Sequence, residues 1–455
     1  MENKNTNLDS LIEKYTSICL DNCRIDPDLN VKHKVFRGLR DLDGRGVLTG
    51  LTEISDVISR KMVDGKEIFC PGELYYRGYN IKNIVDGFTS QNRFGFEEVT
   101  YLLLFGTLPN EEQLAEFKNN LGALRTLPDN FVRDVIMKAP SSDLMNSLAR
   151  SVLTLYSYDR KADDTSIPNL IRQSLQLIAR FPALAVYSYN AHNYHWKKSD
   201  SFFIHEPRCD LSTAENILYL LRIDGNYTEL EAKVLDMALV LHAEHGGGNN
   251  STFTTHVVSS SGTDTYSAIA AALGSLKGPK HGGANLKVSA MFEDIKANVK
   301  DWNDDEEISN YVDKIVNKQA FDKTGLVYGI GHAIYSVSDP RAQIFKGYVE
   351  KLSAAKGLKD EFSLYSKVEE LAPKLISKQR KMYKGVSANV DFYSGFVYDM
   401  LGLPRELFTP IFAIARISGW SAHRIEEILN AGKIIRPAYM AVEPHKDYIP
   451  LEHRK

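Results

Sequence analysis

Residues 241–285 read LHAEHGGGNNSTFTTHVVSSSGTDTYSAIAAALGSLKGPKHGGAN. Two breaks rich in glycine and histidine, HAEHGGGNN and GPKHGGAN, enclose one predicted helix. Asp264 is a good N-cap for this helix, because its carboxylate can accept hydrogen bonds from the N–H groups of the first turn. Apolar residues then recur at helical spacing until Gly278-Pro279 ends the pattern: Ile269, Leu273 and Leu276.

Three histidines lie where predicted helices meet these breaks. Residues 234–241 are apolar nearly all round, which predicts a buried helix that ends at His242. His242, His245 and His281 therefore lie where buried helices open into glycine-rich turns. Glycine lets backbone and ligand approach closely and leaves N–H groups free to face an anion. This stretch is the best candidate for a functional site in the sequence.

The composition of the 455-residue chain is typical of a soluble globular protein with two or three domains, at 43% hydrophobic and 25% charged residues. A net charge of −3 gives no overall basic field for nucleic acid or an anionic membrane. No apolar run approaches the roughly 18 residues of a membrane span. The start, MENKNTNLDS, has the pattern of neither a signal peptide nor a transit peptide. We expect a cytoplasmic protein without nucleic-acid or membrane partners.

The sequence predicts no metal ion. Cys19 and Cys23 are four residues apart, but no second pair completes a zinc-ligand pattern, so the cysteines are expected to be reduced thiols. In HAEH, His242 and His245 could form a metal pair, but no further ligand motif accompanies them.

Apolar residues at helical spacing recur through most of the chain, in nearly unbroken succession from about 90 to 245 and again after 285. Residues 35–58 alternate apolar and polar residues among glycines, which predicts short strands or turns, and 72–85 predicts a hairpin or turn that leads into a helix. The predicted class is all-α with a small β element near the N-terminus.

Further residues outside 241–285 could carry chemistry. His332 lies in a Gly-x-Gly turn, Arg341 follows a break imposed by proline, and Asp391 lies among apolar neighbours shortly before a glycine. Arg416 lies in a strongly apolar helix, and an unpaired buried guanidinium is costly. Arg416 therefore needs an acidic partner, either a structural one such as Glu426 or an anionic ligand, and the spacing leaves both open.

Taken together, these motifs closely resemble the citrate synthase family. HAEHGGGNNSTFTTH, SLKGPKHGGAN, GIGHAIYSVSDPRA, NVDFYSG, ARISGW and the late Arg436-Pro437 match that family in order and approximate spacing, and the resemblance covers roughly 36–440. It implies a two-domain helical fold, with a large dimer-forming domain of 1–285 and 403–455 and a small domain of 286–402 that closes over the active site. Glycines near 282 and 395 would lie at the domain crossings, where a hinge is plausible.

The resemblance also implies the reaction and the roles of residues. The enzyme would be an acyltransferase that condenses acetyl-CoA with oxaloacetate and hydrolyses citryl-CoA to citrate and CoA, with no cofactor, because the CoA thioester is a substrate. It implies the catalytic set His281, His332 and Asp391. His245, His332, Arg341 and Arg416 would bind oxaloacetate, and Arg436 would reach the same ligand from the partner subunit of a homodimer.

These residue types suit that chemistry. The α-proton of a thioester and an ordinary aspartic acid differ by roughly 15 pKa units, on the order of 20 kcal/mol, so tuning Asp391 alone cannot close the gap. Neutral His281 would stabilise the incipient enolate by donating to the thioester oxygen. His332 would donate to the ketone oxygen of oxaloacetate. Arginine rather than lysine suits positions 341, 416 and 436, because guanidinium forms paired hydrogen bonds to carboxylates.

Some departures from the family pattern remain. Many relatives have a basic residue where this chain has Ser336, and Lys346 is a nearby candidate to meet CoA phosphates. The triple glycine after His245 is unusual, and residues 1–34 do not resemble the NADH-binding region of some bacterial relatives. Three alternatives stay open: a 2-methylcitrate synthase that uses propionyl-CoA, a non-catalytic homologue, and a zinc hydrolase built on HAEH.

Overall fold

The computed structural model describes residues 12–18, 20, 24–36, 38–41, 46–199, 202–332, 334–380, 385–430 and 433–454. The chain divides into two compact units, 1–51 and 52–455. In the described part of the first unit, a short helix, α2 (Asp28–Lys32), has no buried residue. Cys19 and Cys23 lie outside the described residues. All the elements that follow belong to the second unit.

A small sheet precedes the helices. Strands β1 (Ser55–Val63) and β2 (Lys66–Tyr76) pair antiparallel, and β3 (Tyr79–Asn80) pairs with the end of β2, in the order β1-β2-β3. The turn between β2 and β3 leads into helix α3, as predicted for 72–85. Short strands or turns were predicted for 35–58. Among the described residues of that range, the only named strand is β1, which begins at Ser55.

Helices make up most of the second unit, which confirms the predicted all-α class with a small β element. Their bounds are α3 (Ile81–Ser90), α4 (Phe96–Phe105), α5 (Glu111–Ala123), α6 (Leu144–Leu155), α7 (Ile167–Trp196), α8 (Thr213–Leu221), α9 (Glu229–His242), α10 (Asn250–Ser259), α11 (Thr265–Lys277), α12 (Ala284–Asn298), α13 (Asp305–Val316), α14 (Pro340–Ala355), α15 (Lys359–Arg380), α16 (Val390–Met400) and α17 (Phe408–Asn430). None of the described helices is both long and apolar enough to cross a membrane.

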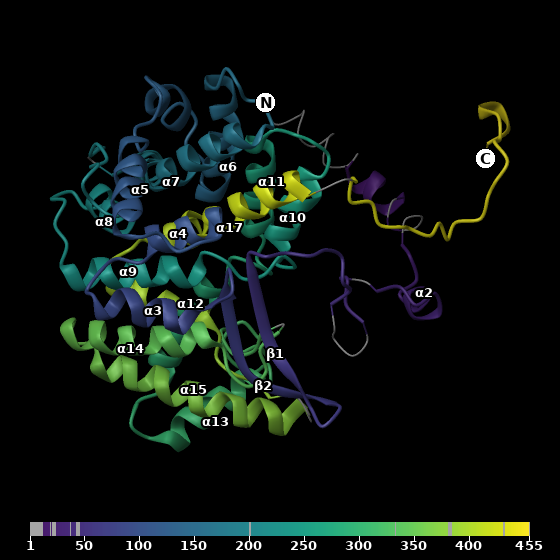
Figure 1. The fold of residues 1–455 in the computed structure, drawn as a ribbon. Helices are drawn as coiled ribbons and strands as arrows, with labels where there is room; N and C mark the ends of the chain where they lie inside the picture. Colours follow the sequence, from purple (N-terminus) through teal and green to yellow (C-terminus); the bar gives the residue numbers. More distant parts are fainter. Residues whose placement is uncertain are drawn as a thin grey trace. The chain divides into compact units, whose positions relative to one another are not determined.

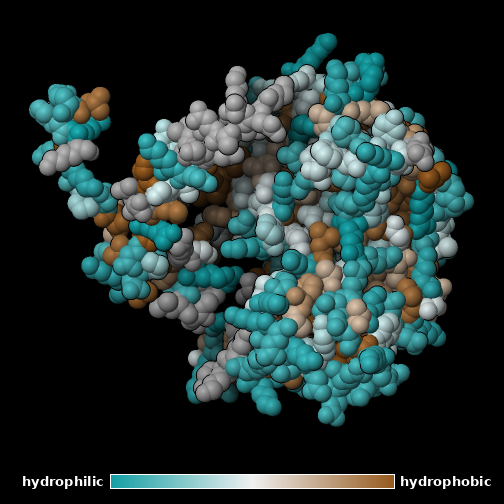
Figure 2. All heavy atoms as spheres, turned by 180° about the vertical axis from the view of Figure 1, so that it is seen from behind, coloured by the Kyte–Doolittle hydropathy of each residue, from teal (hydrophilic) through white to brown (hydrophobic). Residues whose placement is uncertain are grey.

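Helix α17 is the central element of this unit (Figure 1). It packs against α4, α6, α7, α9, α10 and α11, and every residue from Phe408 to Ile425 is buried. Helices α12 to α16 pack chiefly against one another, with further contacts from α14 and α16 to α9. The division into domains at 286 and 402 stays a prediction. On the face shown in Figure 2, hydrophilic residues dominate and apolar residues form small separate groups.

The stretch 241–285 contains two helices rather than the one predicted. As expected, α9 ends at His242, and α11 begins after Asp264, whose carboxylate accepts from the Ser267 N–H at 2.8 Å. The additional helix, α10, begins after Asn249. Its buried face consists of hydroxyl side chains instead of an apolar stripe, so hydrophobic periodicity gave no sign of it: Ser251, Thr252, Thr255 and Ser259.

Candidate active site

The β hairpin fixes the turn that follows α9. The Tyr76 hydroxyl lies 3.1 Å from the Val240 carbonyl and 3.0 Å from the Glu244 carbonyl. The Ser55 hydroxyl donates to Glu244 Oε1 at 2.9 Å and accepts from the Gly246 N–H at 3.1 Å. These bonds hold the HAEH segment against the sheet, with all four of its residues buried.

Two histidines predicted to bind the ketoacid lie side by side. The ring centroids of His245 and His332 are 5.1 Å apart, and Tyr335 stacks on His332 at 5.0 Å. Burial lowers the pKa of His245 well below its usual value, and the positive charge of Arg341 lowers it further. Nδ1 of His332 accepts the backbone N–H groups of residues 334 and 335 at 3.1 and 3.2 Å. In a neutral His332 ring the proton therefore lies on Nε2.

Backbone pairing brings the His332 loop to the start of α16. The Asn389 N–H donates to the Gly329 carbonyl at 2.9 Å, and the Asn389 side chain donates to the Gly331 carbonyl at 2.7 Å. The same Asn389 side chain caps α16 by accepting from the Asp391 N–H at 2.9 Å. One asparagine thus links the loop of His332 to the helix turn that carries Asp391, although about 60 residues separate them in sequence.

The surroundings of the Asp391 carboxylate raise its pKa. It is only partly exposed, and no hydrogen bond to its carboxylate oxygens is found within the described residues. Burial raises the pKa of Asp391 to about 6, against the opposing effects of Arg341 and Arg416, while Asp339 raises it further. A carboxylate with a pKa near neutrality is suited to act as a general base.

Arg341 is oriented by a neighbour on its own helix. Its Nε and Nη2 atoms donate to the two Asp339 oxygens at 3.1 and 2.7 Å, and both side chains are buried. Burial alone would lower the pKa of Arg341, but the attraction of Asp339 outweighs it and the pKa is raised. Asp339 also caps α14, so the guanidinium lies at the first turn of that helix.

Arg416 retains unused hydrogen-bonding capacity. Its Nε donates to the His242 carbonyl at 2.7 Å, whereas Nη1 is buried and has no hydrogen-bond partner among the described residues. Burial lowers the pKa of Arg416 to about 10, with Glu244 acting in the opposite direction. Glu426 accepts from the Glu53 N–H instead, and no described hydrogen bond or ion pair joins it to Arg416. Glu426, the acidic partner named from the sequence, is therefore not the partner of Arg416 among the described contacts, and Glu244 is the carboxylate whose charge acts on it.

His281 is held by a residue of the unpredicted helix α10. Its Nε2 lies 3.0 Å from the Ser251 hydroxyl, to which the Trp420 indole N–H donates at 3.1 Å. Burial, together with the charge of Arg416, lowers the pKa of His281 to about 4, so the ring is neutral at pH 7. The charge of Arg416 thus acts on two predicted catalytic residues, His281 and Asp391.

Arg436 is the predicted site residue that the single chain does not bring to this cluster. It lies in an extended segment after α17, and its side chain is exposed. Lys346, the candidate for meeting the CoA phosphates, has its Nζ 2.6 Å from Glu369, and Ser336, where many relatives have a basic residue, is buried. The side chains positioned to hold a metal ion in the described part of the chain do not include His242 or His245, so a zinc site at HAEH is not supported.

Several residues of this cluster were not predicted from the sequence. Tyr76 is brought to the cluster by long-range packing of the hairpin, and its own local pattern does not indicate a role. The other four lie within the motifs that carry the family resemblance and could have been named: Glu244 and Ser251 in HAEHGGGNNSTFTTH, and Tyr335 and Asp339 in GIGHAIYSVSDPRA.

Gly419 allows α17 to approach the HAEH turn. A Cβ atom at this position would lie 2.3 Å from Glu244 Oε2 and 2.5 Å from the Ala243 carbonyl. We expect Gly419→Ala to destabilise the protein by about 1–3 kcal/mol, because backbone must move to make room. The matched control is Gly274→Ala in α11, where a Cβ meets nothing within 4 Å and alanine should be neutral or stabilising. Thermal midpoints at one scan rate compare the two, and equal midpoints would contradict the packing argument.

Comparisons with known proteins place the chain in a family. The model of the family described as "Citrate synthase, C-terminal domain" matches residues 39–438. The chain belongs to the citrate synthase family. It is therefore an enzyme of the acyl-transferring, condensing type.

Relatives within the citrate synthase family are similar along most of their length. A citrate synthase from Synechocystis sp. is 35% identical over 397 residues, which are 86% of this chain and 90% of the relative. A 2-methylcitrate synthase from Shewanella oneidensis is 34% identical over 387 residues, which are 84% of this chain and 92% of the relative. The crystal structure of citrate synthase from Pyrobaculum aerophilum has a TM-score of 0.74 at 30% identity and covers 92% of this chain and 95% of that one.

A further similar structure was solved with ligands bound. Citrate synthase from Thermoplasma acidophilum, in a ternary complex with carboxymethyl coenzyme A and oxaloacetate, has a TM-score of 0.74 at 28% identity and covers 92% of this chain and 99% of that one. These structural neighbours agree with the all-α fold of the described residues.

Proposed function

We propose that the protein condenses acetyl-CoA with oxaloacetate and hydrolyses citryl-CoA to citrate and CoA. The observation that carries this proposal is the set of groups on which the charge of Arg416 acts. Asp391 has a pKa of about 6, His281 is neutral, and Nη1 of Arg416 itself has no hydrogen-bond partner in the described part of the chain. Most of the similar relatives are named citrate synthase, and the Thermoplasma acidophilum enzyme is described with oxaloacetate and a CoA derivative. The catalytic set His281, His332 and Asp391 belongs to this proposal.

The first step would form an enolate from acetyl-CoA. Asp391 removes a methyl proton, and His281 donates a hydrogen bond to the thioester oxygen as negative charge develops there. Because Trp420 can only donate, the Ser251 hydroxyl proton is free to point to His281 Nε2 or to Asn249 Oδ1, each at 3.0 Å. We assign the Ser251 proton to His281 Nε2, which leaves the His281 proton on Nδ1 as the donor to the thioester oxygen.

The second step would join the enolate carbon to the ketone of oxaloacetate. His332 carries its proton on Nε2, since Nδ1 accepts backbone N–H groups, and it donates that hydrogen bond to the ketone oxygen. Arg341, Arg416 and His245 bind the carboxylates, with the orphaned Nη1 of Arg416 and Nε2 of His245 as atoms that a bound ligand would satisfy. The reaction needs no cofactor, because the activated acyl group arrives as a thioester substrate.

A domain closure belongs to the same proposal. Residues 286–402 would form the small domain that closes over the ketoacid and excludes water, and 1–285 with 403–455 would form the large domain. The glycines near the crossings allow close packing there: a Cβ at Gly395 would lie 2.5 Å from the Ser289 hydroxyl, and one at Gly282 would lie 2.3 Å from the Leu276 carbonyl.

Release of free CoA tests the function directly. The purified protein is incubated with oxaloacetate and either acetyl-CoA or propionyl-CoA, and kcat/KM is compared. A 2-methylcitrate synthase is the second candidate, because one such enzyme is 34% identical, close to the 35% of the citrate synthases. A higher value with propionyl-CoA would favour that candidate, and no CoA release with either substrate would point to a non-catalytic homologue.

The pKa of Asp391 predicts a pH profile. Because the folded-state pKa is raised to about 6, the base form predominates above pH 6 and is lost as the pH falls below it. We expect kcat/KM for acetyl-CoA to fall about tenfold per pH unit well below pH 6. His281 adds no second break between pH 5 and 8, since its pKa is about 4. A profile that stays flat down to pH 5 would contradict the assignment of Asp391 as the base.

We also propose a homodimer in which Arg436 completes the site of the partner subunit. Residues 433–454 are extended apart from a short 3-10 turn, and their large apolar side chains are exposed, which suits a segment that packs on a second copy of the chain: Ile434, Tyr439, Met440, Tyr448, Ile449 and Leu451. Arg436 is exposed on the same segment.

Mixed dimers test the position of Arg436. We expect Arg436→Ala to raise KM for oxaloacetate by one to two orders of magnitude, because a carboxylate loses a charged hydrogen-bond donor. Co-expression of Arg436→Ala with Asp391→Ala chains should restore a site with normal KM only if the arginine is contributed across the interface. Continued loss of affinity in every active mixed dimer would place Arg436 in its own subunit's site. Exposed Lys433, three residues earlier, provides a control as Lys433→Ala.

A further inference from the structure

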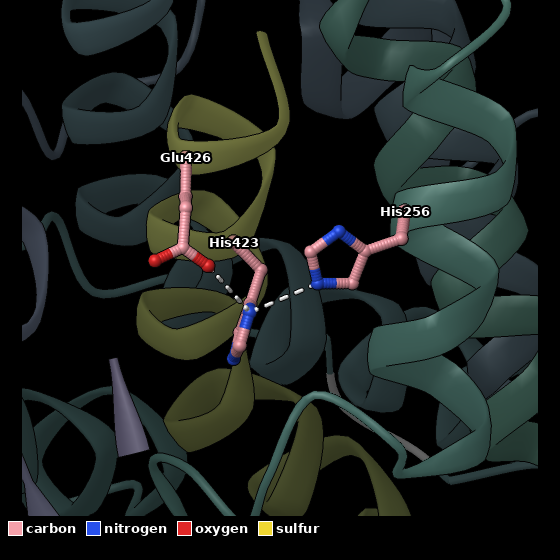
Figure 3. A group of neighbouring side chains, drawn as sticks. All are labelled: His256, His423 and Glu426. Carbon is pink, nitrogen blue, oxygen red and sulfur yellow. Dashed lines mark hydrogen bonds and ion pairs between the residues drawn. The ribbon is translucent and has the colours of Figure 1, made fainter. Parts of the chain in front are cut away.

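Two histidines and a glutamate meet between α10 and α17, outside the residues assigned to the reaction. Figure 3 shows His256 from α10 facing His423 and Glu426 from α17. His256 Nε2 lies 3.0 Å from His423 Nδ1, and Glu426 Oε2 lies 3.8 Å from the same Nδ1. One ligand atom from each of the three residues lies within 4.8 Å of the other two.

A carboxylate oxygen lies close to the outer nitrogen of each imidazole. His256 Nδ1 lies 2.7 Å from Glu427 Oε2, and His423 Nε2 lies 3.1 Å from Glu244 Oε1. A carboxylate beside a ring nitrogen favours the tautomer with the proton on that nitrogen, so we assign the proton of each neutral ring to its outer nitrogen.

This arrangement leaves two lone pairs facing each other. If each neutral ring has its proton on the outer nitrogen, the inner nitrogens at 3.0 Å are both acceptors and repel. A cation between them removes the conflict, and the cation is either a shared proton or a metal ion. The inner nitrogens are thus preset as ligands by their outer partners, which is the usual orientation of metal-binding histidines.

The charge around the two rings favours a divalent ion over a single proton. Glu244, Glu426 and Glu427 bring three carboxylates to the pair. Glu426 Oε1 accepts from the Glu53 N–H at 2.8 Å, whereas Glu426 Oε2 is buried and accepts no hydrogen bond from the part of the chain that is described. Glu426 Oε2 and the two inner imidazole nitrogens are therefore three neighbouring acceptors. A bound cation would give all three a partner.

We propose that His256, His423 and Glu426 bind a divalent transition-metal ion of the zinc class. Two imidazole nitrogens and a carboxylate oxygen are donors that zinc accepts, and Mg²⁺ and Ca²⁺ prefer oxygen alone. Ligands of a tetrahedral zinc ion lie about 3.3 Å apart, so the observed separations need only small side-chain shifts. His256 is 13% exposed, which leaves a side from which the ion and a water ligand can enter.

Direct metal binding by the unaltered protein tests the proposal. The protein is stripped with a chelator, dialysed against Zn²⁺, Co²⁺ or Mg²⁺ at pH 7.5, and its metal content is measured per chain. We expect one Zn²⁺ or Co²⁺ per chain, no retained Mg²⁺, and a thermal midpoint raised by Zn²⁺. Binding should weaken at least tenfold at pH 5.5, where protons compete for both imidazoles. Zinc content at background level overturns the proposal and leaves a shared proton between the rings.

Variants locate the ion. His256→Asn keeps an amide donor near Glu427 but removes the inner nitrogen, and Glu426→Gln removes the charge of the third ligand; each should weaken zinc binding at least tenfold. His195→Ala, which removes an exposed imidazole near the end of α7, is the matched control and should bind zinc like the unaltered protein. Stoichiometric zinc of unchanged affinity in His256→Asn would place the ion elsewhere and refute the site.

Discussion

Asp391→Ala should lower kcat by about three orders of magnitude or more while leaving the affinity for oxaloacetate nearly unchanged. A positioned general base contributes roughly 10²- to 10⁴-fold to rate, and no other described carboxylate combines a pKa of about 6 with attraction from both Arg341 and Arg416. In the proposed site, the guanidinium groups and not this carboxylate bind oxaloacetate. CoA release measures the first quantity, and calorimetric titration with oxaloacetate measures the second.

Asp399→Ala is a suitable control, because this carboxylate lies two turns further along α16 and burial raises its pKa as well. It should retain nearly full turnover. The thermal midpoint of Asp391→Ala should not fall at pH 7, since a raised folded-state pKa means that the ionised form destabilises the fold there. Joint loss of oxaloacetate binding and turnover in Asp391→Ala would identify a structural aspartate.

Arg416→Met should weaken oxaloacetate binding by about 10²- to 10³-fold. Charge-assisted hydrogen bonds to a carboxylate contribute about 1.5–3 kcal/mol each, and a guanidinium can form two of them. In the free protein, the same guanidinium makes one described hydrogen bond, to the His242 carbonyl, and burial lowers its pKa to about 10. Its removal should therefore cost affinity for the ketoacid more than it costs stability.

Arg424, eight residues further along α17, provides the opposite case. It is also fully buried, but it donates to the Thr265 hydroxyl, the Ser259 hydroxyl and the Thr263 carbonyl at 3.2, 3.0 and 2.7 Å. Arg424→Met leaves those acceptors unpaired, so it should lower the thermal midpoint more than Arg416→Met does and leave the oxaloacetate Kd within a few-fold. If the two variants shift Kd equally, Arg416 does not bind the ketoacid directly.

Local signals in the sequence were sufficient for much of the fold. The Asp264 cap, the apolar face of α11 and the helix that ends at His242 depend on neighbouring residues only, and the structure agrees with each. Helix α10 was missed because its buried face is built from hydroxyl groups, which propensity and hydrophobic periodicity do not mark. Without α10, neither Ser251 beside His281 nor His256 beside His423 could be placed.

Relations between distant residues were beyond a single sequence. The proximity of His332 to the start of α16 depends on hydrogen bonds from Asn389 to Gly329 and Gly331, and spacing alone contains no trace of that pairing. The motifs did indicate that His332 and Asp391 belong together, but only through resemblance to a family. Which nitrogen of His332 carries the proton follows from backbone N–H groups that the sequence cannot orient.

Helix α17 carries both Arg416 and His423, seven residues and therefore about 10 Å apart along one rigid axis. Glu244 lies between them, attracted by both side chains. We therefore expect a cation bound beside His423 to change the affinity of the proposed site for oxaloacetate. Thermodynamic reciprocity then fixes the result: by whatever factor a cation at His423 changes the affinity for oxaloacetate, oxaloacetate changes the affinity for that cation by the same factor.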